Sequence, residues 1–175
     1  MLDYFDVAYG SCSISEILEK SLGYRKIFIA NRDVKIVDGN NYRNKDIQGG
    51  IFFNTGKQNI FSILSMSPVA VAFSDLRINK KAMEQMNDKG IALCMPTSII
   101  TSSYGLQRSR NMYMAKRLLE HARKIKLDVS IVTLANNATQ LCSYMQLIEI
   151  AELLGMSEEC ARESISRVNK SLVIE

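Results

Sequence analysis

Positive charge gathers on one predicted helix, residues 109–127, and is the clearest chemical pattern in the sequence. Arg110, Arg117, His121 and Lys124 follow one another at spacings of seven, four and three, which places them on one helix face with Tyr113 beside it. The basic residues that flank this face are Arg108, Lys116, Arg123 and Lys126. A stripe of this kind can neutralise several phosphates, which would give shape-directed RNA binding without base specificity.

Only Glu120 interrupts the positive sign of this helix. Any solvated helix carries charges, so an ordinary surface helix remains the alternative interpretation, and a solvated side chain is the simpler interpretation of His121. We interpret the nearly unbroken sign as the mark of a binding face. The residues predicted to contact RNA are Arg77, Arg108, Arg110, Lys116, Arg117, His121, Arg123 and Lys124.

Groups able to perform catalysis are few. Metal-assisted hydrolysis needs several His, Asp or Glu side chains that converge on one site. Just after the predicted strands the only carboxylates are Asp33 and Asp75, and His121 is the single histidine of the chain. A Ser/His/Asp or Cys/His site would have to use this same histidine. The sequence therefore predicts no catalytic residue and no metal ligand.

Residues 55–58, Thr-Gly-Lys-Gln, resemble the end of a phosphate-binding loop. The upstream glycine is at the wrong distance, however, and Gln58 stands where a magnesium-binding hydroxyl is needed. Backbone amides there could still hold an anion, with a plain helical turn as the alternative. The cysteines are too scattered for a zinc or redox motif, and we expect four buried free thiols, Cys12, Cys94, Cys142 and Cys160.

Length and composition favour one intracellular domain. The chain has 175 residues, of which 47% are hydrophobic, enough for a substantial core, and its net charge is +4. No apolar run reaches the roughly 18–20 residues that cross a bilayer, and the acidic N-terminus differs from a signal peptide. We expect a cytoplasmic protein with no membrane partner, folded as a single domain over residues 1–175.

Strand and helix patterns alternate along the chain. Continuous apolar runs at 26–30, 51–53, 69–73, 91–95 and 129–134 are typical of strands buried on both faces, with weaker candidates at 4–7 and 35–37. Helices are expected after a capping box at 13–16, after the cap Asn79, over 109–127, from Thr139 to 154 with Gly155 ending it, and from Ser157 to Lys170. We therefore expect an α/β fold with mostly parallel strands, a shortened or incomplete TIM-like (β/α) barrel, because the strands fall short of eight.

Much of the second half of the chain also resembles a known family. Residues 151–161, Ala-Glu-Leu-Leu-Gly-Met-Ser-Glu-Glu-Cys-Ala, carry the most specific part of the resemblance. The other matching positions are Asn79, residues 89–93, Pro96, Arg110, residues 118–126 and 129–133, and in the first half Leu22-Gly23-Tyr24 before the strand at 26–30. These positions are similar to the barrel-type protein subunit of archaeal and eukaryotic ribonuclease P, called component 3 in archaea.

The resemblance implies a barrel related to metal-dependent hydrolases that has no active site. It implies binding to the ribonuclease P RNA together with a small ferredoxin-like subunit and other ribonuclease P proteins, while the RNA, with magnesium, removes the 5′ leader of precursor tRNA. The chain itself would bind no cofactor. It departs from the family after the last strand, where Val132-Thr133-Leu134-Ala135 replaces Ser-Ser-Gly-Ala, and Cys142-Ser143-Tyr144 replaces a later Arg, small residue and Pro.

Two alternatives remain open from the sequence. One is a small barrel hydrolase, dependent on a metal, with an unusual site on Asp33 or Asp75. The other is a scaffold that binds only protein, through a basic face that meets an acidic partner.

Overall fold

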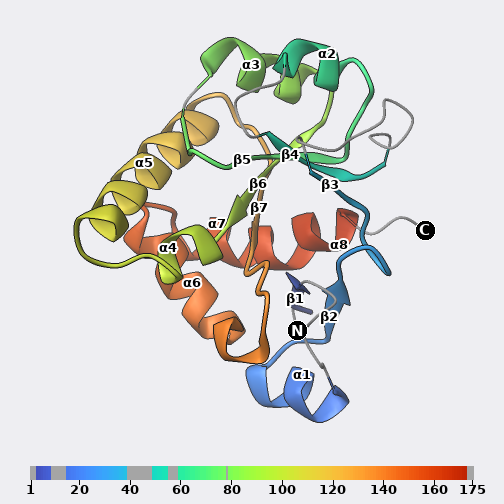
Figure 1. Ribbon diagram of the computed structural model, residues 1–175, viewed down its shortest axis with the longest axis vertical. Coiled ribbons are helices and arrows are strands. Elements are labelled where there is room, and N and C mark those ends of the chain that lie inside the picture. Colours follow the sequence, from blue (N-terminus) through green and yellow to red (C-terminus); the bar gives the residue numbers. More distant parts are fainter. Residues whose placement is uncertain (1–2, 9–14, 39–48, 55–58, 78, 173–175) are drawn as a thin grey trace.

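The computed structural model describes residues 3–8, 15–38, 49–54, 59–77 and 79–172 (Figure 1). Within them every paired strand is parallel to its neighbour, as predicted. The larger sheet has the order β3 (Ile36–Asp38), β4 (Ile51–Asn54), β5 (Ala70–Phe73), β6 (Ala92–Pro96) and β7 (Val129–Val132). The smaller sheet pairs β1 (Phe5–Ala8) with β2 (Lys26–Ile29). All seven predicted strands, including both weaker candidates, are confirmed.

Helices follow most of the strands and cover the larger sheet. They are α1 (Glu16–Leu22), α2 (Ile60–Leu64), α3 (Lys80–Asp88), α4 (Ser98–Thr101), α5 (Gly105–Lys124), η2 (Ala138–Gln140), α6 (Tyr144–Leu153), α7 (Glu158–Glu163), the π-helical turn η3 (Ser164–Val168) and α8 (Asn169–Ser171). Figure 1 shows α7, η3 and α8 as one stretch that passes between the larger sheet and the β1–β2 pair. No helix among the described residues is both long and apolar enough to cross a membrane.

The two faces of the larger sheet carry side chains of different size. On β5 and β6 the residues Val71, Phe73, Leu93 and Met95 belong to a cluster with the outer helices. Their neighbours Ala70, Ala72, Ala92 and Cys94 point to the other face, in a cluster with Val168 and Leu172 of the C-terminal stretch. Because successive residues of a strand face opposite sides, two covered faces require a continuous apolar run. This explains why these strands are readable from the sequence.

Three helix boundaries differ from the sequence prediction. Ser15 caps α1, its side chain accepting from the Leu18 amide, whereas positions 13 and 14 of the predicted capping box lie outside the described residues. The helix α5 starts at Gly105 and not at 109. The helix α6 starts at Tyr144 and not at Thr139, because Ser143 and Gln146 form a capping box there.

Three predicted helix boundaries are confirmed. Asn79 caps α3, with its side chain accepting from the Ala82 amide. At the C-terminus of α6, Gly155 has φ +94° and the Met156 amide donates to the Ala151 carbonyl (3.0 Å). This is the hydrogen bond of a Schellman ending. Ser157 begins the last helical stretch as predicted. This stretch widens into a π turn at η3.

The strands do not form one closed hydrogen-bonded barrel within the described residues. Between β7 and β1 there is a single β-bridge, Ala8 with Ala135, and a hydrogen bond from the Leu134 amide to the Val7 carbonyl (2.8 Å). The expectation of parallel strands is therefore confirmed, whereas closure into a barrel is not found. The boundary between β7 and β1 is called the seam below.

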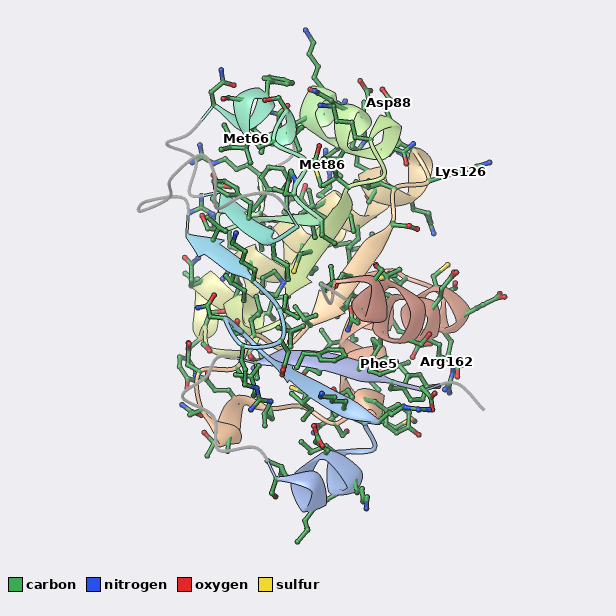
Figure 2. All side chains as sticks on the ribbon, turned by 90° about the vertical axis from the view of Figure 1, so that its right-hand side faces the viewer. Phe5, Met66, Met86, Asp88, Lys126 and Arg162 are labelled. Carbon is green, nitrogen blue, oxygen red and sulfur yellow. The ribbon has the colours of Figure 1, made fainter. Side chains whose placement is uncertain are left out.

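Side chains satisfy the backbone of β7 along the seam. The Ser164 hydroxyl donates to the Val129 carbonyl (2.6 Å) and accepts from the Ile131 amide (3.0 Å), as a neighbouring strand would. Asn169 Nδ2 donates to the carbonyls of Ile131 and Phe5 (both 2.8 Å), which ties β7 to β1. Figure 2 shows Phe5 beneath the C-terminal helical stretch that supplies these groups. The helical stretch therefore substitutes for a missing strand at this position.

A buried carboxyl group completes the seam. Asp6 is fully buried and accepts from the Thr133 amide (2.7 Å) and from the Thr133 hydroxyl (2.6 Å). Burial raises the pKa of Asp6 from its ordinary value of 3.8 to about 6, and the hydrogen bonds from Thr133 offset part of this effect. The Thr133 hydroxyl also lies 3.3 Å from the Val7 carbonyl, so it can donate there when Asp6 is protonated.

This pKa predicts how stability depends on pH. The native state holds the Asp6 proton to a higher pH than the unfolded chain does, so this group lowers the free energy of unfolding as pH rises from about 4 to 7. The decrease is on the order of 3 kcal/mol. Asp6→Asn keeps the shape and can donate to Thr133, so the variant is expected to lose this decrease and to be more stable than the wild type at pH 7.

Chemical denaturation at a series of pH values measures this effect. Asp88→Asn, at an exposed position, is the control for loss of one carboxylate. If the free energy of unfolding changes equally with pH in the wild type and in Asp6→Asn between about pH 4 and 7, the raised pKa of Asp6 is contradicted.

Candidate nucleic-acid interface

The predicted binding helix, α5, is held against the sheet by one narrow face. Its buried residues are Ala115, Leu118, Leu119 and Ala122, which match the predicted apolar stripe. At its start, Asn111 Nδ2 donates to the Ile99 carbonyl (2.9 Å) and fastens α5 to α4. The rest of the helix faces outward, and Figure 1 shows α5 along one flank of the molecule.

Three of the predicted cations form an exposed line along α5. Arg110, Arg117 and Lys124 are all exposed and lie seven residues apart, almost two full turns. The line spans about 21 Å of helix axis. Arg117 Nη1 donates to the Tyr113 hydroxyl (3.1 Å), and its guanidinium lies 5.9 Å from the Tyr113 ring centroid. We call Arg110, Arg117 and Lys124 the α5 ridge.

The other predicted cations of α5 lie beside the ridge. Arg108 is exposed in the first turn of the helix, and Lys116 is exposed on the flank next to Gly155. Arg123 lines a cavity of about 310 Å³, with Met156 and Cys160, between α5 and α7. The structure therefore keeps these three side chains at the surface, with Lys116 and Arg123 both beside Gly155.

His121 does not lie where the sequence analysis placed it. The side chain is half-buried, and its Nε2 is covered with no hydrogen-bond partner among the described residues. It lies seven residues after Met114 and four before Ile125, and both of these are packed against the core. The expectation of a solvated histidine opposite the apolar stripe was therefore wrong, because His121 belongs to the flank of α5. We leave it out of the ridge.

Within the described part of the chain, no ion pair involves a charge of α5. The helix carries six basic residues and one acidic residue, a net charge of +5, whereas the whole chain is +4. The ion pairs found among the described residues are Arg25–Asp3, Arg32–Asp33, Arg77–Asp75 and Arg162–Glu158, and none involves α5. The remainder of the chain is close to neutral, so the positive potential is concentrated on this one helix.

Helix stability does not explain all of these cations. Arg123 and Lys124 in the last turn interact favourably with the negative end of the helix dipole. Arg108, in the first turn, faces the positive end, and no acidic residue stands in that turn to compensate. Positive charge at the start of α5 therefore opposes helix formation, which favours a role in binding.

Arg77 and Arg110 meet in a second cavity. The cavity has a volume of about 250 Å³ and is lined by Asp75, Arg77, Gln107 and Arg110 among others. Arg77 Nε lies 3.2 Å from Asp75 Oδ2, so the charge of Arg77 is paired. Arg110 forms no ion pair with another described residue. The structure thus brings Arg77, which comes from the loop after β5, next to one end of the α5 ridge.

The two carboxylates considered for hydrolysis are each bound to an arginine. Asp33 accepts from Arg32 (2.9 Å) and from the Ile29 amide (2.8 Å), and the Arg32 guanidinium lowers the pKa of Asp33. Asp75 pairs with Arg77 as described. Among the described residues there is no group of three or more His, Cys, Asp or Glu side chains placed to hold a metal ion. Residues 55–58, the possible anion-binding turn, lie outside the described part.

The described cysteines are free thiols but differ in exposure. Cys94 is fully buried, and burial raises the pKa of its thiol to about 12, which keeps it protonated. Cys142 is half-buried and Cys160 is exposed, so the expectation of buried thiols holds for only one of these three. Cys12 lies outside the described residues.

One cavity was not anticipated from the sequence. It lies between α4 and the start of α6, has a volume of about 510 Å³, and is lined by Tyr104, Gln140 and Gln146 among others. Sequence reasoning missed it because Tyr104 precedes the helix start expected at 109, and Gln140 was placed inside a helix from Thr139. The spacing of Ser143 and Gln146, a capping box, was the signal that could have moved that helix start.

No family model and no curated protein matches the sequence. The structure is similar to a chain of the cryo-EM structure of archaeal ribonuclease P with mature tRNA, with a TM-score of 0.61 and 14% identity, over 97% of this chain and 81% of that chain. It is also similar to A. niger ochratoxinase, with a TM-score of 0.52 and 18% identity, over 71% of this chain and 30% of that chain. At these identities the similarity to ribonuclease P concerns the fold.

The ridge makes a prediction for binding to RNA. Replacing Arg110, Arg117 and Lys124 by alanine removes three cations without disturbing the helix, since alanine has the best helix propensity. If each cation neutralises one phosphate, the slope of log affinity against log salt falls by about two to three. Electrophoretic mobility shifts of a duplex RNA in increasing KCl measure this slope.

A matched variant controls for net charge. Lys20, Lys80 and Lys81 are exposed on α1 and α3, and their replacement by alanine removes the same total charge away from α5. This variant should keep the wild-type slope. Similar losses in both triple variants would mean that RNA responds to net charge and not to the ridge.

Proposed function

We propose that this chain is a non-catalytic protein subunit of ribonuclease P, which uses the α5 ridge to bind and stabilise the catalytic RNA. The observation that carries the proposal is the ridge itself: three exposed cations in line on a helix of net charge +5 with no ion pair to another described residue. Unneutralised positive charge of this kind favours a polyanionic partner.

The similarity of fold supports the choice of ribonuclease P among RNA-binding assemblies. It extends over 97% of this chain, and the sequence resemblance, strongest at residues 151–161, leads to the archaeal component 3 family. On this proposal the two sheets are arcs of an incomplete TIM-like barrel that forms one domain, and the chain acts in the cytoplasm. The partners would be the ribonuclease P RNA, the ferredoxin-like subunit, other ribonuclease P proteins and precursor tRNA as the substrate of the assembly.

The chain's own residues supply binding in this proposal and no chemical step. The RNA, with magnesium, would remove the 5′ leader of precursor tRNA. The ridge would act by reducing the repulsion between RNA phosphates, so the RNA would hold its active shape at lower magnesium concentration. The hydrolase alternative has less support, because Asp33 and Asp75 are each engaged by an arginine.

Reconstitution tests the proposal. The full chain, the ferredoxin-like subunit and the ribonuclease P RNA are combined, and cleavage of precursor tRNA is measured over a range of magnesium concentrations. The two proteins are expected to restore cleavage at low magnesium, and the chain alone is expected to cleave nothing. The ridge triple alanine variant should need more magnesium than the Lys20, Lys80 and Lys81 variant.

Two outcomes would contradict the proposal. Cleavage that is unchanged by the presence of the chain would leave only a similarity of fold. Binding to an acidic protein that persists at high salt, with no binding to RNA, would favour the scaffold alternative.

A further inference from the structure

A polar cavity without charge lies next to the start of α5. The cavity of about 510 Å³ is lined by side chains from α4, η2 and α6 and from the turn before α5: Thr101, Ser102, Tyr104, Gln140, Cys142 and Gln146. Its size lies within the range of about 300–1,000 Å³ typical of ligand sites. Every lining residue is uncharged, although the basic helix α5 begins beside it. The cavity is therefore suited to a polar, uncharged group.

Two glutamine side chains present amide donors with a fixed orientation. Gln140 Oε1 accepts from the Asn136 amide (2.8 Å), and Gln146 Oε1 accepts from the Ser143 amide (2.8 Å). A backbone N–H can only donate, so in both side chains the oxygen must face the backbone and the Nε2 group is the end left over. Neither Nε2 donates to another described residue. The two residues therefore offer N–H donors for a carbonyl oxygen of a ligand.

An exposed aromatic ring stands at the edge of the same cavity. Tyr104 is 82% exposed, whereas Tyr113 is 58% and Phe61 is 42% exposed. Its backbone is extended, and the following Gly105 has φ +52°, a left-handed conformation that glycine adopts without strain. The turn thus holds Tyr104 outside the helix, with a ring face available for stacking.

We propose that this cavity binds an unpaired nucleobase, which stacks on Tyr104 while its carbonyl oxygens accept from Gln140 and Gln146. This inference rests on the proposed function and adds to it a single-stranded segment as the form of RNA that is bound. Arg108 follows Tyr104 by four residues, about one helical turn, so it lies on the same side of α5 and can contact a phosphate of the bound strand. Stacking of splayed bases on aromatic rings is the usual mode of single-stranded RNA recognition. A keto base such as uracil satisfies the two donors, whereas adenine has no carbonyl oxygen.

Fluorescence anisotropy with the full chain tests the pocket, using a single-stranded oligouridine and a blunt-ended RNA duplex as probes. Tyr104→Ala is expected to weaken binding of oligouridine on the order of tenfold, the effect of one stacked base. Binding of the blunt-ended duplex should stay within about twofold, because the pocket needs an unpaired base and this duplex has none. Tyr104→Phe keeps the stacking surface and should bind like the wild type. Phe61→Ala, another exposed aromatic residue on α2, is the matched control.

The donors have their own test. Gln140→Glu and Gln146→Glu keep an oxygen for the backbone amide and remove the Nε2 donor, so the fold is retained. The double variant should lose roughly threefold to tenfold in affinity for oligouridine, the range of one or two net hydrogen bonds. The double variant Met145→Glu and Leu153→Glu adds the same two negative charges at exposed positions of α6 outside the lining and controls for repulsion.

The outcomes separate this inference from the proposed function. If the wild type binds oligouridine and the duplex, and the ridge variant loses both while Tyr104→Ala loses neither, the pocket inference is overturned and the proposed function stands. If the wild type binds neither RNA, both fail. If Tyr104→Ala impairs binding to the ferredoxin-like subunit and leaves oligouridine binding intact, the surface is a protein contact and the inference is overturned.

Discussion

The fold depends on how the amide and carbonyl groups at the edge of β7 that faces β1 find hydrogen-bond partners. A strand edge that is buried without partners leaves amide and carbonyl groups unpaired, at a cost of about 1–3 kcal/mol for each group. Here the partners are side chains: the Ser164 hydroxyl bonds both to the Ile131 amide and to the Val129 carbonyl, and Asn169 joins Ile131 to Phe5. The C-terminal helical stretch thereby replaces a strand, and β1 is held to the larger sheet without a continuous ladder.

The helix α5 of the candidate interface is attached directly to β7, the strand that borders the seam. The helix α5 leads into β7 within a few residues, and its buried face packs in the same cluster as Leu93 and Ile131 of the sheet. Figure 2 shows Lys126, which follows α5, at the same end of the molecule as Asp88 at the end of α3. Asn87 Nδ2 donates to the Ile125 carbonyl (2.9 Å) at this end. With both ends fixed, one by α4 and one by α3, α5 holds the backbone of the three ridge residues in line along its axis.

A line of exposed positive charge favours a polyanionic partner. Cations in the last turn of α5 are explained in part by the helix dipole, but those in its first half are not. Arg117 stacked against Tyr113 shows how a ridge side chain keeps its orientation while it remains exposed. On the proposed function, RNA phosphates would lie along the helix, and the uncharged cavity beside Tyr104 would bind a base at its start.

The sequence predicts the strands and the ridge well, because both depend on local spacing. Continuous apolar runs reflect strands covered on both faces, and a seven-residue spacing places Arg110, Arg117 and Lys124 in line in any helix. The start of α5 was missed since Tyr104 caps it without a side-chain hydrogen bond, which leaves no local signal. His121 was misplaced because spacing gives the angle around a helix but not which neighbouring elements cover its flanks.

The seam could not be predicted from the sequence at all. Asp6 and Thr133 are 127 residues apart, and Asn169 and Phe5 are 164 residues apart. Their pairing depends on the tertiary fold, and a single aspartate or asparagine in an apolar region has no distinguishing local pattern. The cavity beside α4 was missed for the same reason, because it is assembled from three separate elements.

The most direct test of the account is a cryo-EM structure of this chain assembled with ribonuclease P RNA and the ferredoxin-like subunit. The account predicts that Arg110, Arg117 and Lys124 lie within about 3 Å of phosphate oxygens of the RNA. A reconstruction in which α5 faces solvent, or packs against a protein while the RNA contacts another surface, would contradict it.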